Sequence, residues 1–308
     1  MALRTGDIIM KLFKKCPGWK NLSEEELKKL KMTMVEISSD FIDVCEKYHL
    51  RYMMGAGTAL GAVRHHGFIP WDDDMDFHMP RKDYMRFLEV AEKELGDKYF
   101  IRSISKGDDV WYPTIHVIQK GSRYVNYADL ITIDHEPIEM QGIYVDIFPY
   151  DNASSIKIVR DLKGIMALTL MLMASCVNIK EDIKYLKAHH VDIDKADLKA
   201  LAFKKMLGSI FGVLSAKKWT KIIDKFLASN HNDNSEWVTC YYGKHLQKYT
   251  HHRKDLWGEK REVFEGHSWR IATNTDLYLT KEYSKDYMTP PPADKRKIHP
   301  VFELEFKK

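Results

Sequence analysis

The acidic run Trp71-Asp72-Asp73-Asp74-Met75-Asp76 is the part of the sequence best suited to carry chemistry. Asp74 and Asp76 stand two residues apart in a segment typical of a β-strand, and side chains two apart in a strand leave from the same face. Met75 then points the other way, into apolar packing. Neighbouring carboxylates repel each other unless a cation lies between them, and Asp oxygens suit Mg²⁺ or Mn²⁺. The spacing therefore predicts a divalent-metal site, with a solvated acidic loop as the alternative.

A third carboxylate, Asp146, interrupts the apolar run Ile143–Phe148. A charge inside a strand is costly unless it is paired or binds a metal. If this strand lies beside the strand of Asp74 and Asp76, the three carboxylates can hold two metal ions, an arrangement used for in-line displacement at phosphorus. An ion pair with a buried arginine is the alternative for Asp146.

A turn of small residues, Gly55-Ala56-Gly57-Thr58, precedes the acidic run. It follows a short predicted strand at Arg51–Met54 and opens a predicted helix that begins near Ala59. A strand, a turn and a helix in this order present backbone N–H groups at a helix N-terminus, where anions bind. The order of small-residue turn, acidic strand and isolated strand Asp is the one expected of a nucleotidyltransferase-type active site.

The elements that must position these residues follow from hydrophobic periodicity. Ser23 and Glu26 form a capping box that opens a helix running to about Lys47. The other elements predicted around one sheet are a helix at Asp83–Leu95 and strands at Met75–Met79, Tyr99–Ile104, Thr114–Gln119 and Ile143–Phe148, the last ended by Pro149. From Ser154 to about Asn230 the pattern is helical and rich in lysine, and a further helical piece is expected at Thr275–Tyr283.

Composition narrows the class of protein. The chain has 308 residues, of which 44% are hydrophobic, and that is enough for a large core. A formal net charge of only +4 does not predict a nucleic-acid partner. The cysteines form no CxxC pair and the first residues do not resemble a secretory signal, so we expect a reduced, cytoplasmic protein. These cysteines are Cys16, Cys45, Cys176 and Cys240.

One apolar run bears on membrane contact. No stretch reaches the roughly 18 to 20 apolar residues of a spanning helix, and the nearest is Ile165–Val177. We interpret this run as a buried core helix, with docking at a membrane surface as the alternative.

Three blocks of sequence resemble a known family. The run from Gly57 to Asp76, Gly-Thr-Ala-Leu-Gly-Ala-Val-Arg-His-His-Gly-Phe-Ile-Pro-Trp-Asp-Asp-Asp-Met-Asp, closely resembles the signature of the LicD family of phosphotransferases, which includes fukutin-type ribitol-phosphate transferases. The block Gly142–Pro149 looks like the downstream motif of that family. The C-terminal pattern, which is similar more loosely, comprises Tyr278-Leu279-Thr280, Tyr283, Tyr287-Met288, Pro290-Pro291-Pro292 and His299. The family usually has Tyr-Gly-Asp-Tyr in this last block, whereas this chain has Tyr283-Ser284-Lys285-Asp286-Tyr287.

The resemblance implies an α+β fold with a nucleotidyltransferase-like mixed sheet core, flanking helices and a helical insertion. The division expected is a catalytic core at residues 1–151, the Lys-rich insertion at 152–232, and a C-terminal segment at 233–308 that completes the catalytic domain. The implied activity is metal-dependent transfer of a phosphorylated alcohol, in most bacterial members phosphocholine, from a CDP-activated donor. The acceptor would be a hydroxyl of a cell-surface glycan or glycolipid, such as lipopolysaccharide, teichoic acid or capsule.

Roles follow for individual residues. Asp74, Asp76 and Asp146 would be the catalytic residues and would hold Mg²⁺ or Mn²⁺, two ions in all, with Asp146 as the base for the acceptor hydroxyl. Gly57 and Thr58 would present N–H groups and a hydroxyl to the donor diphosphate, and Arg64 would neutralise charge on the phosphate. Asp72 and Asp73 would orient metal-bound water or the metal ligands, with a plain turn as the alternative.

Aromatic and basic residues give further expectations. Trp71 and the aromatic residues Trp111, Tyr112, Tyr124 and Tyr127 are candidates for a cage around a quaternary ammonium, with core packing as the alternative. The lysines at 204, 205, 217, 218, 221 and 225 would form a solvated face or, with a lipid-linked acceptor, rest on anionic headgroups at the inner face of a membrane.

Two other functions stay open. The first is a glycosyltransferase that binds a nucleotide sugar through the two acids, although such pairs usually follow a nucleotide-binding half. The second is a protein that recognises phosphocholine or a glycan without catalysis, which the three intact acids disfavour.

Overall fold

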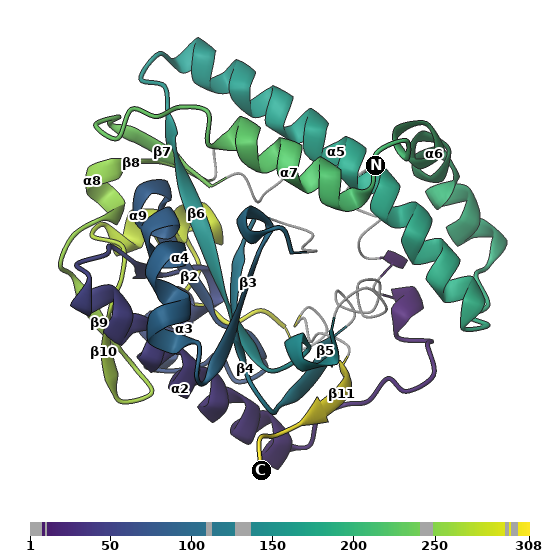
Figure 1. Ribbon diagram of the computed structural model, residues 1–308, viewed down its shortest axis with the longest axis horizontal. Helices are drawn as coiled ribbons and strands as arrows, with labels where there is room; N and C mark the ends of the chain where they lie inside the picture. Colours follow the sequence, from purple (N-terminus) through teal and green to yellow (C-terminus); the bar gives the residue numbers. More distant parts are fainter. Residues whose placement is uncertain are drawn as a thin grey trace.

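A mixed β-sheet forms the centre of the molecule, and helices pack around it (Figure 1). The computed structural model describes residues 8–9, 11–108, 113–126, 137–240, 249–292, 296 and 301–308. Within these ranges one sheet joins seven strands in the order β1-β2-β6-β4-β3, with β7 paired to β6 and β8 paired to β7. The strands are β1 Met53–Met54, β2 Asp76–Pro80, β3 Tyr99–Ser103, β4 Ile115–Gln119, β6 Tyr144–Ala153, β7 Trp237–Thr239 and β8 Thr250–His252.

Two further strand pairs lie outside this sheet. β9 (Arg261–Phe264) pairs with β10 (His267–Arg270), and β5 (Arg123–Asn126) pairs with β11 (Val301–Glu305) near the C-terminus. The helices are α2 Glu24–Lys47, α3 Ala56–His65, α4 Arg81–Leu95, α5 Lys157–Ala188, α6 Lys195–Phe211, α7 Ala216–Leu227, α8 Arg253–Leu256 and α9 Thr275–Glu282, with single 3₁₀ turns η1 at Ile104–Lys106 and η2 at Ile138–Met140. The predicted fold class, an α+β mixed sheet with flanking helices and a helical insertion, is confirmed.

The two faces of the sheet differ in chemistry. Phe77 on β2 lies beside Ile147 on β6, which lies beside Ile115 on β4, and all three are fully buried. Helices α2 and α4 cover this row, with the Phe41 ring 5.2 Å from Phe77. Met75 is buried on the same side, as predicted. Because strand side chains alternate, the intervening residues must leave from the opposite face.

Helix α2 begins as the sequence predicts. The Ser23 side chain accepts a hydrogen bond from the backbone N–H of Glu26, and the Glu26 carboxylate accepts one from the backbone N–H of Ser23. This reciprocal pair satisfies N–H groups that the first turn of a helix cannot bond internally.

Strand β6 is longer than predicted. Pro149 does not end it, because the strand continues to Ala153 and Pro149 is the register partner of Met79 on β2. The N–H of Asp146 donates to Met75 O on β2, so the nitrogen of Pro149, three residues on, points away from β2. On that side pairing with β4 ends at Ile147 and pairing with β7 starts at Asp151. Proline is therefore tolerated, since no partner there needs its N–H.

The predicted helical segment is three helices, α5 to α7. Helix α7 packs between α5 and the sheet, with Ile223 and Leu227 of α7 against Ala167 and Ala174 of α5 (Figure 1). Among the described residues, α5 is the one helix long and apolar enough to cross a membrane by length and composition, although buried helices pass the same test. Only 28% of its most apolar window is buried, so the interpretation as a core helix holds for one side of α5 and not for the other.

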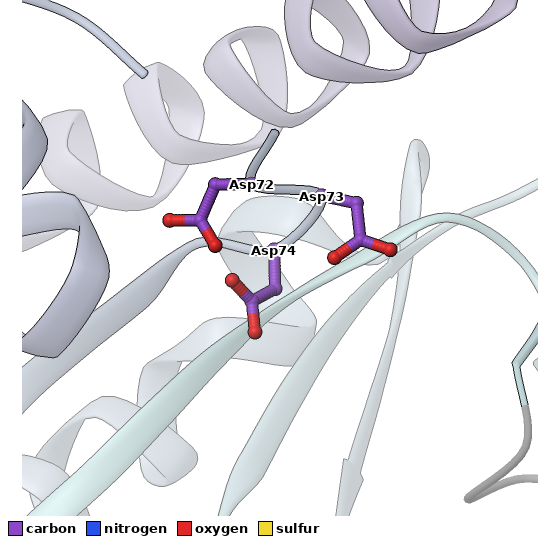
Figure 2. Close-up of side chains that lie close together, drawn as sticks. All are labelled: Asp72, Asp73 and Asp74. Carbon is purple, nitrogen blue, oxygen red and sulfur yellow. The ribbon is translucent and has the colours of Figure 1, made fainter. Parts of the chain in front are cut away.

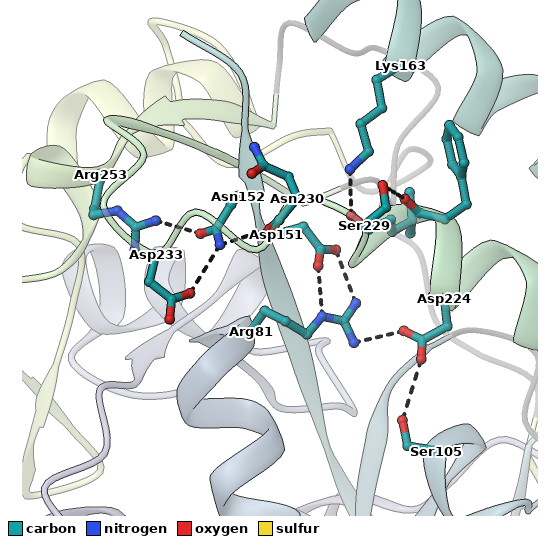
Figure 3. Close-up of polar contacts among 12 residues, drawn as sticks. Arg81, Ser105, Asp151, Asn152, Lys163, Asp224, Ser229, Asn230, Asp233 and Arg253 are labelled. Carbon is teal, nitrogen blue, oxygen red and sulfur yellow. Dashed lines mark hydrogen bonds and ion pairs between the residues drawn. The ribbon is translucent and has the colours of Figure 1, made fainter.

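Arg81 joins the helical insertion to the sheet. Its guanidinium bonds Asp151 on β6 through Nε at 2.7 Å and Nη2 at 3.1 Å, and Asp224 on α7 through Nη1 at 2.8 Å (Figure 3). Burial alone would lower the pKa of Arg81, but the two carboxylates outweigh it and raise that pKa. The arginine is thus held in its charged form between two elements that are far apart in the sequence.

Replacing Arg81 with methionine should destabilise the fold by about 3–5 kcal/mol, because it leaves the buried carboxylate of Asp151 without its charged partner. The free energy of unfolding in urea measures this. Lys82→Met is the control, since Lys82 pairs with Asp233 at the surface, where an ion pair contributes only about 0–1 kcal/mol. Equal losses for the two variants would contradict this account of Arg81.

Candidate functional site

A row of ionisable side chains crosses four neighbouring strands of the sheet. Asp76 on β2 is the register partner of Asp146 on β6, Asp146 of His116 on β4, and His116 of Arg102 on β3. Register partners leave a sheet from the same face, and neighbouring strands lie about 4.8 Å apart. The structure therefore brings the predicted acids of two distant segments side by side, on the face opposite α2 and α4.

Asp76 is held in place by its own backbone. Its N–H donates to Thr58 Oγ1 at 2.9 Å, and its carbonyl accepts from Gly55 N at 2.8 Å. Thr58 is buried and its hydroxyl positions Asp76, while its contact with a diphosphate stays a prediction.

The carboxyl of Asp76 is costly to ionise. Burial raises its pKa well above the usual value, and the negative charges of Asp74 and Asp146, followed by those of Asp72 and Glu282, raise it further. Such a group stays protonated unless positive charge is brought to it.

Asp72, Asp73 and Asp74 lie on the turn that enters β2 (Figure 2). One oxygen from each of these carboxylates can be chosen so that all three lie within 4.8 Å of one another. Among the described residues, these three carboxylates form the group whose oxygens lie close enough together to hold one metal ion. Asp74 belongs both to this group and to the predicted set of ligands. The other two predicted ligands, Asp76 and Asp146, lie next to each other on β2 and β6. Divalent metal chemistry fits these residues, since carboxylate oxygens are the donors Mg²⁺ and Mn²⁺ prefer.

Gly57 lies against Asp72 at the N-terminus of α3. A Cβ on Gly57 would stand 2.6 Å from Asp72 Oδ2, so only glycine lets this carboxylate approach the helix so closely. The predicted turn at residues 55–58 is mostly helix, because α3 begins at Ala56 with Gly55 as its N-cap. The helix N-terminus therefore points at the acidic turn, where an anion or a carboxylate is favourable.

Arg64 and Trp71 frame the same region. Arg64 Nη1 donates to Tyr287 O at 2.8 Å, which ties α3 to the C-terminal motif. Burial lowers the Arg64 pKa, while Tyr283 and Asp72 oppose this effect. The guanidinium of Arg296 lies 4.2 Å from the centre of the Trp71 ring, so one face of this indole already binds a cation.

Helix α9 adds residues that sequence reasoning did not assign to the site. The hydroxyl of Tyr278 accepts from Ala56 N at 2.9 Å at the start of α3. Tyr283, the residue after α9, is partly exposed and lies close enough to Asp76 and Glu282 to interact with their charges. Tyr278, Glu282 and Tyr283 stand in or beside the C-terminal motif. The segment 283–287, where this chain departs from the family pattern, therefore lies next to the acidic site.

His116 and Arg102 were missed by sequence reasoning. His116 Nε2 lies 2.8 Å from Asp146 Oδ1, and Arg102 Nε donates to His116 Nδ1 at 3.1 Å. Because Arg102 donates to Nδ1, Nε2 carries the ring hydrogen and donates to Asp146. The ring also stacks on Tyr144, with centroids 4.5 Å apart. The available signal was a polar residue, His116, inside the apolar strand predicted at Thr114–Gln119.

Tyr124 is the other cage candidate that the described residues include. Tyr124 is buried in the core, with its ring 6.0 Å from that of Tyr144, so core packing is its observed role. Trp111, Tyr112, Tyr127 and His299 lie outside the described residues.

A mixed sheet that presents paired acids beside a helix N-terminus defines a nucleotidyltransferase-type site. Residues 49–162, which hold both acidic strands, match the family model described as the LicD/FKTN/FKRP nucleotidyltransferase domain. The chain is 27% identical over 284 residues to the lipopolysaccharide cholinephosphotransferase LicD of Haemophilus influenzae, a match that covers 90% of this chain and 97% of that protein. Residues 49–162 therefore carry a nucleotidyltransferase domain of the LicD type, and the chain as a whole is similar to a transferase of that family.

Shorter matches occur with two uncharacterised proteins. The chain is 32% identical over 75 residues to RP689 of Rickettsia prowazekii, covering 22% of this chain and 28% of that protein. It is 34% identical over 67 residues to RT0683 of Rickettsia typhi, covering 21% of this chain and 22% of that protein.

Asp76→Asn should raise the melting temperature of the metal-free protein at pH 7–8. The carboxyl has its usual pKa, about 3.9, in the unfolded chain and a higher one in the folded chain. The folded state then binds more protons, so wild-type stability falls as the pH rises from about 4 towards the folded pKa. The gain from asparagine should shrink towards pH 4, and differential scanning calorimetry between pH 4 and 8 measures it.

Mg²⁺ should reverse the order of the two proteins, by stabilising the wild type through mass action and leaving Asp76→Asn nearly unchanged. Asp43→Asn removes an exposed carboxylate from α2 and is the control, with no gain that depends on pH. A lower melting temperature for Asp76→Asn than for the wild type at pH 8 would rule out the charge repulsion described here.

Proposed function

We propose that this protein transfers phosphocholine from a CDP-activated donor to a hydroxyl of a cell-surface glycan or glycolipid, with help from a divalent cation. The observation that carries the proposal is the register of β2 and β6, which makes Asp76 and Asp146 neighbours within the matched nucleotidyltransferase domain. The relative from Haemophilus influenzae, which is a lipopolysaccharide cholinephosphotransferase by name, aligns along nearly its whole length and supports the choice of group and acceptor.

The reaction forms one bond to phosphorus and breaks one. The acceptor hydroxyl oxygen bonds to the phosphorus of the phosphocholine group, CMP leaves, and the hydroxyl proton passes to a base. Asp146 is our candidate for this base, because its side chain is partly exposed and because His116 Nε2–H donates to its Oδ1 atom. That bond orients the carboxylate, and Arg102 fixes the tautomer of the ring.

Asp74, Asp76 and Asp146 would hold Mg²⁺ or Mn²⁺. When bound, such a cation supplies the positive charge that offsets the diphosphate and the acids around it. The N-terminus of α3 favours the negatively charged donor. Arg64, in the last turn of α3 and close enough to Asp72 to interact with its charge, is our candidate for neutralising charge on the phosphate. Trp71 is our candidate for the choline ammonium, since its ring already binds the Arg296 cation.

CDP-choline with Mg²⁺ should raise the melting temperature of the protein. At a CDP-choline concentration of 100 times its Kd, the free energy of unfolding should rise by about 2.7 kcal/mol. CDP-ribitol, CDP-glycerol and a nucleotide sugar serve as competitors. With a glycolipid acceptor the same mixture should release CMP, and Asp146→Asn should lower the rate by about 100-fold or more. Stabilisation by the nucleotide sugar, and not by CDP-choline, would establish the glycosyltransferase alternative instead.

His116→Phe should lower kcat by about 10–100-fold and leave KM for the donor nearly unchanged, because it removes the donor to Asp146 and keeps a ring against Tyr144. His116→Gln, whose amide N–H reaches a similar position, should recover much of the rate. Steady-state kinetics of CMP release distinguish the two. Equal rates for phenylalanine and glutamine would show that the ring only packs.

A further inference from the structure

Helix α5 presents a row of apolar side chains to solvent. Ile158, Leu162, Ile165 and Leu172 follow one another at helical spacing, with Val159 and Met166 beside them, and each is at least 43% exposed. At 100° per residue these positions form one face of α5. On the opposite face Ala167 packs against α7. An exposed row of this kind is unusual for a helix that otherwise packs against protein on one side.

Helix α6 repeats the pattern. Phe203, Met206 and Ile210 are 53–60% exposed and form a row at spacings of three and four, which Val213 continues beyond the helix end. The packed side of α6 is the opposite one: a Cβ on Gly208 would stand only 2.1 Å from Cys176 O of α5. The side of α6 farthest from its neighbour is therefore apolar, where a polar face is expected.

The two rows face the same direction. Cys176 stands one helical turn beyond Leu172 on the same line of α5, and α6 lies over it. The apolar side of α6 therefore faces the same direction as the apolar row of α5. It lies about one helix diameter farther from the axis of α5. Helix α7 lies on the other side of α5, towards the sheet (Figure 1). We call this double row, at residues 158–172 and 203–213, the outer apolar face.

Lysine side chains lie at the ends of the outer apolar face. Residues 157–211, which hold α5 and α6, contain ten lysine and arginine residues against six aspartate and glutamate residues. Lys195 and Lys199 are exposed and continue the row of α6 towards its N-terminus, at the spacing of four that also separates Lys199 from Phe203. Lys157 precedes the row of α5, where Asp161 is already paired with it at 2.5 Å.

We propose that the outer apolar face docks on an anionic lipid bilayer, with its aliphatic and Phe side chains in the headgroup–acyl boundary and its lysines on the headgroups. An apolar centre with a basic margin is the pattern of interfacial helices. Helix α5 lies along the surface and does not cross it, because α6 and α7 hold it from two sides. The inference goes beyond the proposed function and does not depend on it, since docking requires neither a donor nor a metal.

Flotation of the full chain with vesicles tests the proposal. The wild type should float with phosphatidylcholine vesicles that contain phosphatidylglycerol, and the bound fraction should fall with added salt. Leu162→Glu/Met206→Glu should lower the partition coefficient by about tenfold or more. Lys195→Gln/Lys199→Gln should lower it on the order of tenfold on the same vesicles.

Met85→Glu is the matched control, because Met85 on α4 is 40% exposed and lies outside the outer apolar face. It should float like the wild type, and circular dichroism should show each variant folded. Wild type that stays in the soluble fraction, or a Leu162→Glu/Met206→Glu variant that floats like Met85→Glu, overturns the proposal. A wild-type dimer that the same double variant makes monomeric, without vesicle binding, would assign the face to a second copy of the chain.

Discussion

The parallel register of β2 and β6 is the constraint on which the site depends. A shift of one residue would turn Asp146 to the opposite face of the sheet, towards the apolar side chains under α2 and α4. Two hydrogen bonds oppose such a shift: Asp146 N donates to Met75 O, and Asp76 N donates to Thr58 Oγ1 on α3. The chain thus secures the position of two mutually repelling acids through their backbones, which carry no net charge.

Charge is balanced unevenly along the row of strands. Asp146 receives a hydrogen bond from His116, which Arg102 supports from the next strand. Asp76 instead has Asp74 and Asp146 as its strongest charged neighbours, and both disfavour its ionisation. The negative charge of Asp146 is therefore balanced by hydrogen-bond donors on the β4 side of the site. The acids on the β2 side have no comparable positive charge among the groups that act most strongly on Asp76. A metal ion with a phosphate-bearing donor suits that deficiency, because the ion neutralises the acids and the donor together.

Period-two alternation was enough to predict that Met75 is buried away from Asp76. Asp74, which the same pattern placed in the strand, lies on the turn before β2. The sequence pattern also predicted that Asp146 lies in a strand, but strand order is a long-range property, so His116 and Arg102 could not be placed beside Asp146 from local pattern. The prediction that Pro149 ends its strand is wrong, because β4 pairs with β6 only as far as Ile147 and leaves no partner for the missing N–H of Pro149. The end of β4 relative to β6 is not visible in the local sequence. In the insertion, periodicity predicted the helices and could not show which apolar side stays exposed.

Arg81 has a consequence for how the parts of this protein move. It directly follows β2 and bonds Asp151 on β6, while its third contact reaches Asp224 on α7. One guanidinium thus connects the ends of both acid-bearing strands with the helix that supports α5. Helix α5 packs on α7, so the insertion cannot shift relative to the sheet without breaking the buried ion pairs of Arg81. The attachment of the insertion and the ends of the two strands are thus held by the same side chain.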